Sequence, residues 1–535
     1  MAVSESTPAA GNGAEQIAPE TQPLPKKLHG RAFYENIGSP KYIVAPMVDR
    51  SEFAWRMLTR SFMAPEESKS VLAYSPMLHA RLFKQDAGYR AKQFNAIRPT
   101  PGEKGEESLY LDGNPAFDRP LFVQFCANDP DDFFEAARRV APYCDAVDLN
   151  LGCPQGIARR GHYGAFLQED WDLIYKLINR LHTELPIPVT AKFRIQETKE
   201  KTLEYAKMIL SAGASIITLH GRTREQKGHK TGLADWSYIR YLRDNLPPDT
   251  VLFANGNILN HDDIERCLEA TGADGVMSAE ANLTDPSLFS KPPPSGCEGR
   301  EYWRGRDGKG GYRIDAVLRR YLDIIYKYVL ERPPPERKPL YIPSDPEETQ
   351  PELGTTPEQK PEPEQEEGPP KKKQKRDKFA LGNNPNLRFM QGHLFQLFRP
   401  FITTHTNVRD ALVRSNPRDM ATFEHTLALL EQEVKKGLKE YEQFPERFET
   451  KPDPSLTGSK AAIAEYGRPF WVCQPHIRLT PEEAMETGAL QAKKGDKPKK
   501  EEENDQSLEN STPAKPPANS IDTPTTPATD PLVSG

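Results

Sequence analysis

Short apolar runs alternate with helical patterns between about residues 40 and 290, and this alternation restricts the fold more than any other feature of the chain. Several runs are apolar at successive positions, which is typical of parallel strands buried on both faces. Eight such units predict an α/β fold, a (β/α)8 TIM barrel. The main alternative, a doubly wound open sheet, lacks the expected glycine fingerprint after the first strand. The predicted strands are Tyr42–Pro46, Val71–Ser75, Leu121–Cys126, Ala146–Asn150, Pro188–Phe193, Ser215–His220, Val251–Asn255 and Asp274–Ser278.

Composition predicts that much of the chain lies outside folded domains, because only 36% of the residues are hydrophobic and 51 of the 535 are proline. The barrel is expected over residues 31–300, and a small helical domain over 301–332 and 379–450, with one helical pattern at Arg388–Thr403. A C-terminal segment, residues 451–489, should pack on these domains. The expected disordered parts are an N-terminal tail (1–30), a Pro/Glu/Lys-rich linker (333–378) and a C-terminal tail (490–535).

Six widely spaced cysteines without a C-x-x-C pair argue against structural zinc and a disulfide framework. We therefore expect a reducing compartment, the cytoplasm and/or the nucleus, and no metal. No run is long enough to span a bilayer, so no membrane association is expected. A net charge of −6 argues against an overall electrostatic attraction to nucleic acid, but acidic linkers can hide a basic face. The basic run Lys371–Arg376 suits a nuclear-localisation signal or a loose RNA tether.

Polar or glycine-rich residues follow nearly every predicted strand of the barrel. Since the carboxyl ends of parallel barrel strands meet at one mouth, all of them should converge there. They are Pro46, Met47 and Val48 after the first strand, Gln124 in the third, Asn150 and Cys153 after the fourth, Lys192 and Arg194 in the fifth, His220 and Arg222 after the sixth, Asn255, Gly256 and Asn257 after the seventh, and Ala279 and Glu280 after the eighth.

Three of these residues have competing interpretations. Cys153 follows a glycine in a polar loop, which favours a functional thiol over the small buried hydrophobe that we expect at Cys126. Lys192 interrupts an apolar strand, so it either has a structural partner or meets a bound anion or electron-rich ring. His220 is either a satisfied core histidine or a ligand contact.

The motifs around these positions resemble those of the tRNA-dihydrouridine synthases, over roughly residues 40–290. The tail Phe470–Pro475 and Met277–Glu280 look like those of the eukaryotic members that act on positions 16 and 17 of the tRNA D-loop, although Ala281 stands where these members carry glycine. The matching segments are Ala45–Val48, Asn150–Gln155, Arg160–Ala165, Ala191–Arg194, Leu219–Arg224 and Ala254–Ile258.

The resemblance implies a monomeric enzyme that reduces the C5–C6 bond of a uridine in tRNA, with FMN in the barrel mouth and NADPH (or NADH) as reductant. Cys153 would be the catalytic proton donor. The implied cofactor contacts are Pro46, Met47, Val48, Gln124, Lys192, His220, Asn255, Gly256, Asn257, Ala279 and Glu280. The implied substrate contacts are Asn150, Arg159, Arg160, Arg222 and Arg224.

Binding of tRNA by an acidic chain requires a local basic face. We expect it on the loops that carry these arginines and on the helical domain around Arg388 and His393. Two rival functions stay open at this point. One is a flavin barrel oxidoreductase that acts on a small molecule, and the other is a non-catalytic tRNA-binding protein.

Overall fold

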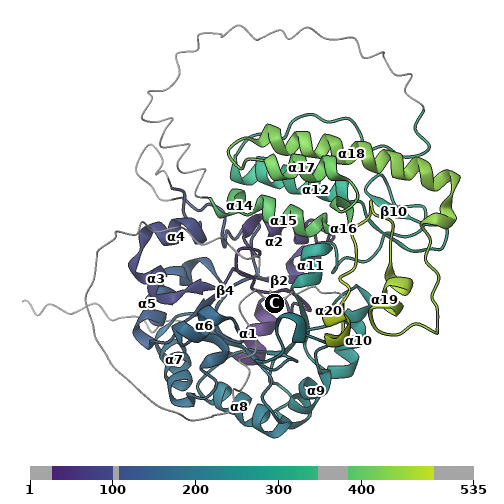
Figure 1. Cartoon of the computed structure of the whole chain (residues 1–535). Helices are drawn as coiled ribbons and strands as arrows, with labels where there is room; N and C mark the ends of the chain where they lie inside the picture. The colour runs from purple at the N-terminus through teal and green to yellow at the C-terminus, as the bar shows by residue number, and fades with distance from the viewer. Residues whose placement is uncertain (1–26, 100–107, 347–383, 487–535) are drawn as a thin grey trace, which may run out of the picture.

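The computed structural model describes residues 27–99, 108–346 and 384–486. Figure 1 shows a barrel with a helical part against one of its sides. The predictions for residues 1–26, 347–383 and 487–535, including the basic run Lys371–Arg376, lie outside the described residues.

Eight parallel strands form a closed barrel, as predicted. The ring closes because β1 pairs with both β2 and β9, and β2 pairs with β4. A short ninth strand, β3 (Leu78–His79), extends the edge of β4. The barrel strands are β1 (Tyr42–Val44), β2 (Val71–Tyr74), β4 (Leu121–Cys126), β5 (Ala146–Leu151), β6 (Val189–Arg194), β7 (Ile217–His220), β8 (Leu252–Asn255) and β9 (Gly275–Ser278).

Amphipathic helices surround this barrel. In α7, residues at three-and-four spacing (Ile174, Leu177, Ile178 and Leu181) are buried, and the Asp170 carboxylate accepts a hydrogen bond from the Leu173 amide at the N-terminus. The helices of the barrel region are α2 (Phe53–Arg60), α3 (Ala80–Gln85), α4 (Ala87–Gln93), α5 (Pro130–Val140), α6 (Gly156–Gly161), α7 (Trp171–Glu184), α8 (Lys199–Ser211), α9 (Trp236–Asn245), α10 (Asp262–Thr271) and α11 (Glu280–Thr284).

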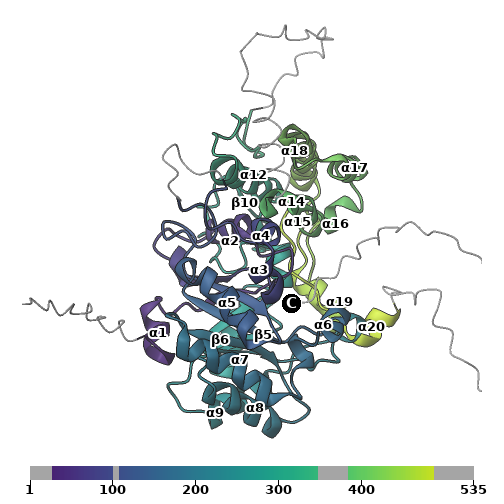
Figure 2. The same ribbon diagram turned by 90° about the vertical axis from the view of Figure 1, so that its left-hand side faces the viewer.

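The amino ends of the strands are covered by α1 (Gly30–Asn36), whose Phe33 ring stacks on Phe122 at 5.9 Å. Figure 2 shows α1 and α20 (Pro481–Glu486) on opposite sides of the barrel, so the carboxyl ends form the open mouth. The predicted N-terminal tail is too long, because Lys27 and Gly30 already bond to the barrel, at Leu185 O and Ser215 Oγ.

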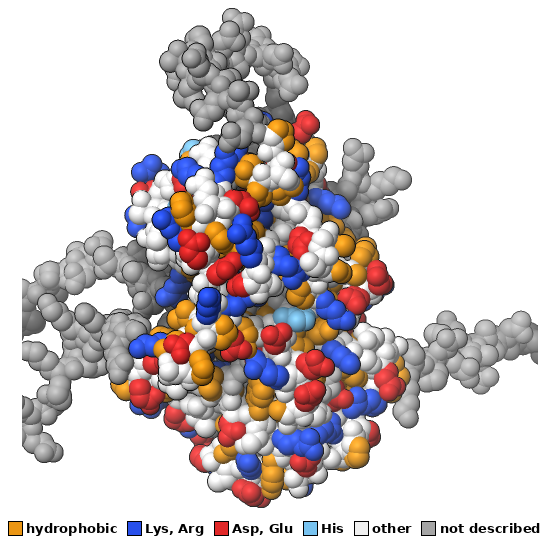
Figure 3. Space-filling view, turned by 90° about the vertical axis from the view of Figure 1, so that its right-hand side faces the viewer, with side chains coloured by type: hydrophobic (Ala, Val, Ile, Leu, Met, Phe, Trp, Pro, Cys, Tyr) orange, Lys and Arg blue, Asp and Glu red, His pale blue; other side chains and the backbone are white. Residues whose placement is uncertain are grey.

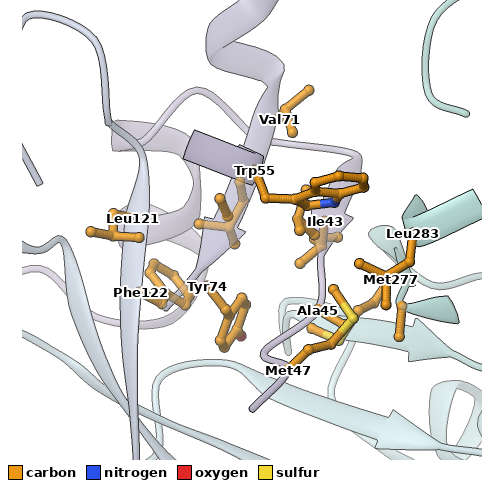
Figure 4. Packing of buried hydrophobic residues seen from close by; sticks show 14 of the residues in the cluster. Ile43, Ala45, Met47, Trp55, Val71, Tyr74, Leu121, Phe122, Met277 and Leu283 are labelled. Carbon is orange, nitrogen blue, oxygen red and sulfur yellow. The ribbon is translucent and has the colours of Figure 1, made fainter. Parts of the chain in front are cut away.

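Apolar side chains from strands far apart in sequence fill the region between β1, β2, β4 and β9. In Figure 4 the Trp55 ring from α2 lies beside Ile43 of β1, and Met47 lies near Met277 of β9. All four residues are at most 4% exposed. The loop that follows β1 is therefore anchored in the core before it reaches the mouth.

The helical part differs from the prediction in two ways. It opens with an unpredicted antiparallel hairpin, β10 (Tyr302–Arg304) and β11 (Gly310–Tyr312). Within Arg388–Thr403 the structure has two short helices and the end of a third, and the last helix begins just before Pro400, since this residue lacks an amide donor and is tolerated only in the first turn of a helix. The helices are α12 (Ile314–Ile324) with a π-helical turn (Ile325–Val329), α14 (Pro385–Arg388), α15 (Met390–Leu397), α16 (Arg399–Ile402), α17 (Thr406–Arg414), α18 (Met420–Gln443) and α19 (Gly458–Tyr466).

The expected linker also starts later than residue 333. Arg337 forms ion pairs with Asp323 (2.6 Å) and Glu424 (2.8 Å), and Leu340 is 6% exposed. The overall composition of the segment is polar and predicts disorder, but a few of its residues attach it to α12 and α18.

A buried junction joins the helical part to the barrel. The His393 ring of α15 stacks on Trp55 at 4.2 Å, and its Nε2 lies 2.5 Å from Glu52 Oε1. Asn386 accepts a hydrogen bond from the Ala54 amide at 2.7 Å. His393 is fully buried, so its predicted place on a basic surface is wrong; Arg388 is exposed.

Two buried arginines of α2 share carboxylates in the loop before β4. Arg56 pairs with Asp112 (2.8 Å) and Asp118, and Arg60 with Asp118 (2.7 Å). Burial opposes ionisation of Asp118, but the guanidinium groups of Arg56 and Arg60 lower its pKa below the ordinary value. A lowered folded-state pKa means that the stability from this group is present above the unfolded-state pKa and is lost as the pH falls.

We predict that Asp118→Asn lowers the free energy of unfolding by about 3 kcal/mol, because it leaves two buried cations poorly compensated. Urea denaturation at pH 7 measures this. Asp244→Asn, which removes an exposed ion pair with Arg240, is the matched control and should change the midpoint little. Equal midpoints for the two variants would contradict the role of the buried network.

Candidate active site

The register of the barrel brings the predicted polar residues to similar heights in the mouth. Asn150 of β5 is opposite Lys192 of β6, Arg194 of β6 is opposite His220 of β7, and His220 is opposite Asn255 of β8. Because neighbouring parallel strands run in register here, residues far apart in sequence become adjacent. This is the convergence that the strand-end pattern predicts.

A cavity occupies this mouth and contains many of the predicted contacts, although Asn255, Gly256, Asn257, Ala279 and Glu280 lie outside its lining. It also contains Arg50, Met77 and Arg194, which were not assigned as site residues. Arg194 donates to the carbonyl oxygens of Gly152 (2.7 Å) and Thr223 (3.0 Å), so it ties two mouth loops together. The lining residues are Pro46, Met47, Val48, Arg50, Met77, Gln124, Asn150, Gly152, Cys153, Pro154, Gln155, Lys192, Arg194 and His220.

A chain of hydrogen bonds positions the Cys153 loop. Thr190 and Gln124 donate to the two carboxylate oxygens of Asp148, at 2.6 and 2.8 Å. Asn150 donates to Gln124 Oε1 at 2.8 Å, and its own oxygen accepts from the backbone amides of Gly152 (3.1 Å) and Cys153 (2.9 Å). Asn150 was expected to bind substrate, and the structure places its oxygen on the backbone of the Cys153 loop.

The backbone and Cβ of Cys153 pack closely against the loop that contains Gly164. Gly164 has a φ of +65°, and a Cβ at this position would lie 2.9 Å from Cys153 Cβ, so only glycine fits. Burial raises the pKa of the Cys153 thiol, although Arg194, Lys192 and Lys227 oppose the shift. The thiol is therefore protonated at neutral pH and is suited to donate a proton.

Buried cationic side chains lie next to the Cys153 loop, on the neighbouring strand β6. Burial and the charge of Arg194 lower the pKa of Lys192 to about 7, against a smaller opposing effect of Asp148. Burial lowers the pKa of His220 well below its ordinary value, so the ring is neutral. Its Nε2 lies 2.8 Å from Arg222 and accepts that hydrogen bond, which leaves Nδ1 as the N–H donor. A bound anion would stabilise the charged form of Lys192.

The loop after β8 forms one edge of the mouth. Gly256 has a φ of +111°, and a Cβ there would lie 2.6 Å from Ala234 Cβ. Asn257 accepts from Arg222 at 3.0 Å, whereas Asn255 Oδ1 is buried and has no hydrogen-bond partner among the described residues. Arg222 is 3% exposed and also donates to Gly232 O, so it lies inside the edge of the mouth and not on an open RNA-binding surface.

The loop after β9 contacts the C-terminal segment. The carboxylate of Glu280, a predicted cofactor contact, makes ion pairs with His476 and Arg478. Burial opposes ionisation of the Glu280 carboxyl, but the hydrogen bond from His476 and the charge of Arg478 lower its pKa to about 2. The preceding Ala279 is buried. No pattern in the sequence indicates that residues 476 and 478 reach the barrel mouth.

The remaining predicted arginines lie outside the cavity. Arg159 and Arg160, on α6, are exposed. Arg224 is held by Glu169 at 2.6 Å and lies over the Phe166 ring at 5.3 Å, so its guanidinium is partly engaged. Of these three arginines, only Arg159 and Arg160 are open to a large ligand.

Within the described ranges, no group of three or more His, Cys, Asp or Glu residues is arranged to hold a metal ion. Across the same residues, no helix has the length and apolar character needed to cross a membrane.

A closed parallel barrel with a protonated thiol facing buried cations at its carboxyl ends is the architecture of a barrel enzyme. The family described as Dihydrouridine synthase (Dus) matches residues 43–303. The chain belongs to this dihydrouridine synthase family.

Curated relatives match far beyond the barrel. The Schizosaccharomyces pombe protein named "tRNA-dihydrouridine(16/17) synthase [NAD(P)(+)]" is 44% identical over 455 residues, which is 85% of this chain and 92% of the relative. The Saccharomyces cerevisiae protein of the same name is 41% identical, over 85% of this chain and 88% of its own length. The S. cerevisiae "tRNA-dihydrouridine(20a/20b) synthase [NAD(P)+]" is 30% identical over 54% of this chain and 72% of its own length.

We predict that Cys153 reacts slowly with iodoacetamide at pH 7, because the thiolate is the nucleophile and burial keeps this thiol protonated. Its alkylation rate should rise with pH, with a midpoint above the ordinary thiol value of about 8.5. Peptide mass spectrometry measures the rate, with the exposed Cys297 as the internal reference. A Cys153 rate that is already at its plateau at pH 7 would show a thiolate and exclude the donor role.

Proposed function

We propose that this chain reduces the C5–C6 double bond of uridine in tRNA to give 5,6-dihydrouridine, with NAD(P)H as reductant and FMN as resident cofactor. The observation that carries the proposal is the protonated Cys153 thiol, held in one cavity with Lys192 and His220. The names of the two 16/17 relatives support tRNA and the nicotinamide reductant. Their higher identity and coverage, compared with the 20a/20b relative, favour positions 16 and 17.

The residues present fit FMN. Its phosphate is anionic, and the mouth holds the cations Lys192, Arg194 and Arg222. The cofactor also carries N–H and hydroxyl donors, and the buried Asn255 Oδ1 is an unpartnered acceptor in the loop after β8. When bound, FMN supplies the hydride that adds to the substrate.

Lys192, His220 and Gln124 would hold the ring, with Lys192 favouring negative charge on it. The wall of Pro46, Met47 and Val48 also lines the cavity. The turn Asn255, Gly256 and Asn257 and the neighbouring Ala279 would flank the phosphate, because the loops after the last two barrel strands are the usual phosphate site.

Cys153 completes the reduction from the other side of the base. One carbon of the double bond receives the hydride, and the other receives the proton from Cys153 Sγ. The resulting thiolate lies near Arg194 and Lys192, whose charges stabilise it until it takes a proton from solvent. The hydrogen-bond chain through Asn150 and Gln124 keeps the thiol oriented.

Access to this site requires that the uridine turn out of the folded RNA, so affinity must come mainly from contacts to the phosphate backbone. Figure 3 shows one face on which basic and acidic side chains are mixed over both the barrel and the helical part. The tRNA contacts that we propose are instead the exposed Arg159 and Arg160 beside the mouth, and Arg388 and Arg399 on the helical part. Burial raises the pKa of Asp49, in the loop after β1. Arg388 lies close enough to this carboxyl for its charge to oppose the rise.

We also propose that the protein is a monomer of the cytoplasm and/or the nucleus. The six cysteines are all free, which suits a reducing compartment.

We predict that Cys153→Ala lowers dihydrouridine formation at least a hundredfold while the FMN content is unchanged, because it removes a proton donor and not a cofactor anchor. Single-turnover assays on unmodified tRNA, with mapping of positions 16 and 17, measure this. Cys297→Ala is the exposed control. Turnover within about threefold of the parent would refute the donor assignment, and equal reduction of free uracil would favour a small-molecule enzyme.

The double reversal Arg388→Glu with Arg399→Glu should weaken tRNA binding on the order of tenfold and reduce its salt dependence, without slowing flavin reduction. Binding measured across a salt series tests this. Arg447→Glu with Arg306→Glu, also exposed, gives a charge-matched control elsewhere on the helical part. Unchanged affinity at every salt concentration would place the RNA on another surface.

A further inference from the structure

The C-terminal segment is a strap that connects the helical part to the barrel mouth. The strap is the part of this segment from Cys473 to Arg478, and it begins at the hairpin region, since Cys473 N donates to Tyr312 O at 2.9 Å. Farther along, His476 N donates to Leu259 O of the loop that follows β8, at 3.2 Å. In Figure 1 the yellow chain that leads to α20 descends from the helical part along the barrel.

Arg478 of this strap projects into the edge of the mouth. Its side chain is 14% exposed, and Nη2 donates to Glu280. Nε is buried and has no hydrogen-bond partner among the described residues. His476 lies 3.4 Å from the same carboxylate oxygen and supports it from the other side. The strap therefore delivers a guanidinium whose hydrogen-bonding capacity is only partly used.

This guanidinium adds to an existing excess of positive charge. Arg478 lies close enough to Arg222 that, after burial, its charge is the largest effect lowering the pKa of Arg222 to about 9. The charge of Arg478 also contributes to the lowered pKa of His220. The carboxylate that faces these cations is that of Glu280. Buried cations in such excess are stable only with a further anion.

We propose that Arg478 and Arg222 together bind a phosphomonoester, that of the flavin cofactor, at the loops after β8 and β9. Glu280 is then a positioning residue that orients Arg478, and not itself a cofactor contact. The inference rests on the proposed function for the presence of FMN. It adds that the site is incomplete without the C-terminal strap, which lies more than 170 residues beyond the last barrel strand.

Riboflavin, which is FMN without the phosphate, provides the discriminating probe. Arg478→Met keeps the aliphatic stem and removes the charge. In flavin-stripped full-length protein, we expect it to raise the Kd for FMN about tenfold or more and the Kd for riboflavin less than about twofold, measured by quenching of flavin fluorescence. Arg478→Lys should be intermediate, since lysine keeps the charge but loses the forked geometry.

Arg266→Met is the matched control. Arg266 pairs with Asp263 of its own helix and also joins the barrel to the C-terminal region through Tyr466, but its side chain is 55% exposed and it lies outside the cationic cluster. It should leave both flavin affinities unchanged. A selective loss of FMN affinity in Arg478→Met alone supports the proposal.

Three outcomes would overturn it. If Arg478→Met weakens the binding of FMN and of riboflavin equally, Arg478 is a structural residue. If the FMN affinity is unchanged, Arg478 does not contact the cofactor. A change only in the ratio of NADPH to NADH reduction rates would assign the phosphate to the nicotinamide cofactor. If the parent chain binds no FMN, the proposal that FMN is the cofactor fails as well. The first three outcomes contradict only the role of Arg478.

Discussion

Closure of the parallel barrel is the constraint on which the rest of the structure depends. The pairings of β1 with β9 and of β2 with β4 close the ring and fix the register of every other strand. That register places Asn150 opposite Lys192 and Arg194 opposite His220. A shift of one residue would turn these side chains out of the mouth, because successive side chains of a strand point to opposite faces.

The barrel architecture permits an excess of buried positive charge. A barrel wall surrounded by helices can hold Lys192, Arg194 and Arg222 away from water, where their pKa values fall to about 7, 10 and 9. Such burial costs stability, and it is typical of sites that bind or transform charged groups. The same burial keeps Cys153 protonated. One physical effect, burial, thus acts on both the cationic side chains and the thiol.

The helical part and the strap are extensions of the site and not a separate module. His393 stacks on Trp55 and contacts Glu52, next to the β1 loop that lines the cavity. The strap reaches Glu280 on the other edge of the mouth. The two appended elements therefore hold the first and the last loops of the barrel.

The sequence by itself determined the barrel, its eight strands and the Cys153, Lys192 and His220 constellation, because apolar runs and strand-end polar residues are local patterns. Only the tertiary structure decided that Asn150 supports the backbone of the Cys153 loop, that Arg222 is buried, that His393 belongs to the core and that Glu280 faces Arg478. These four depend on which residues meet across long sequence separations. Burial and ion pairing are properties of such contacts, and a pattern along one segment does not contain them.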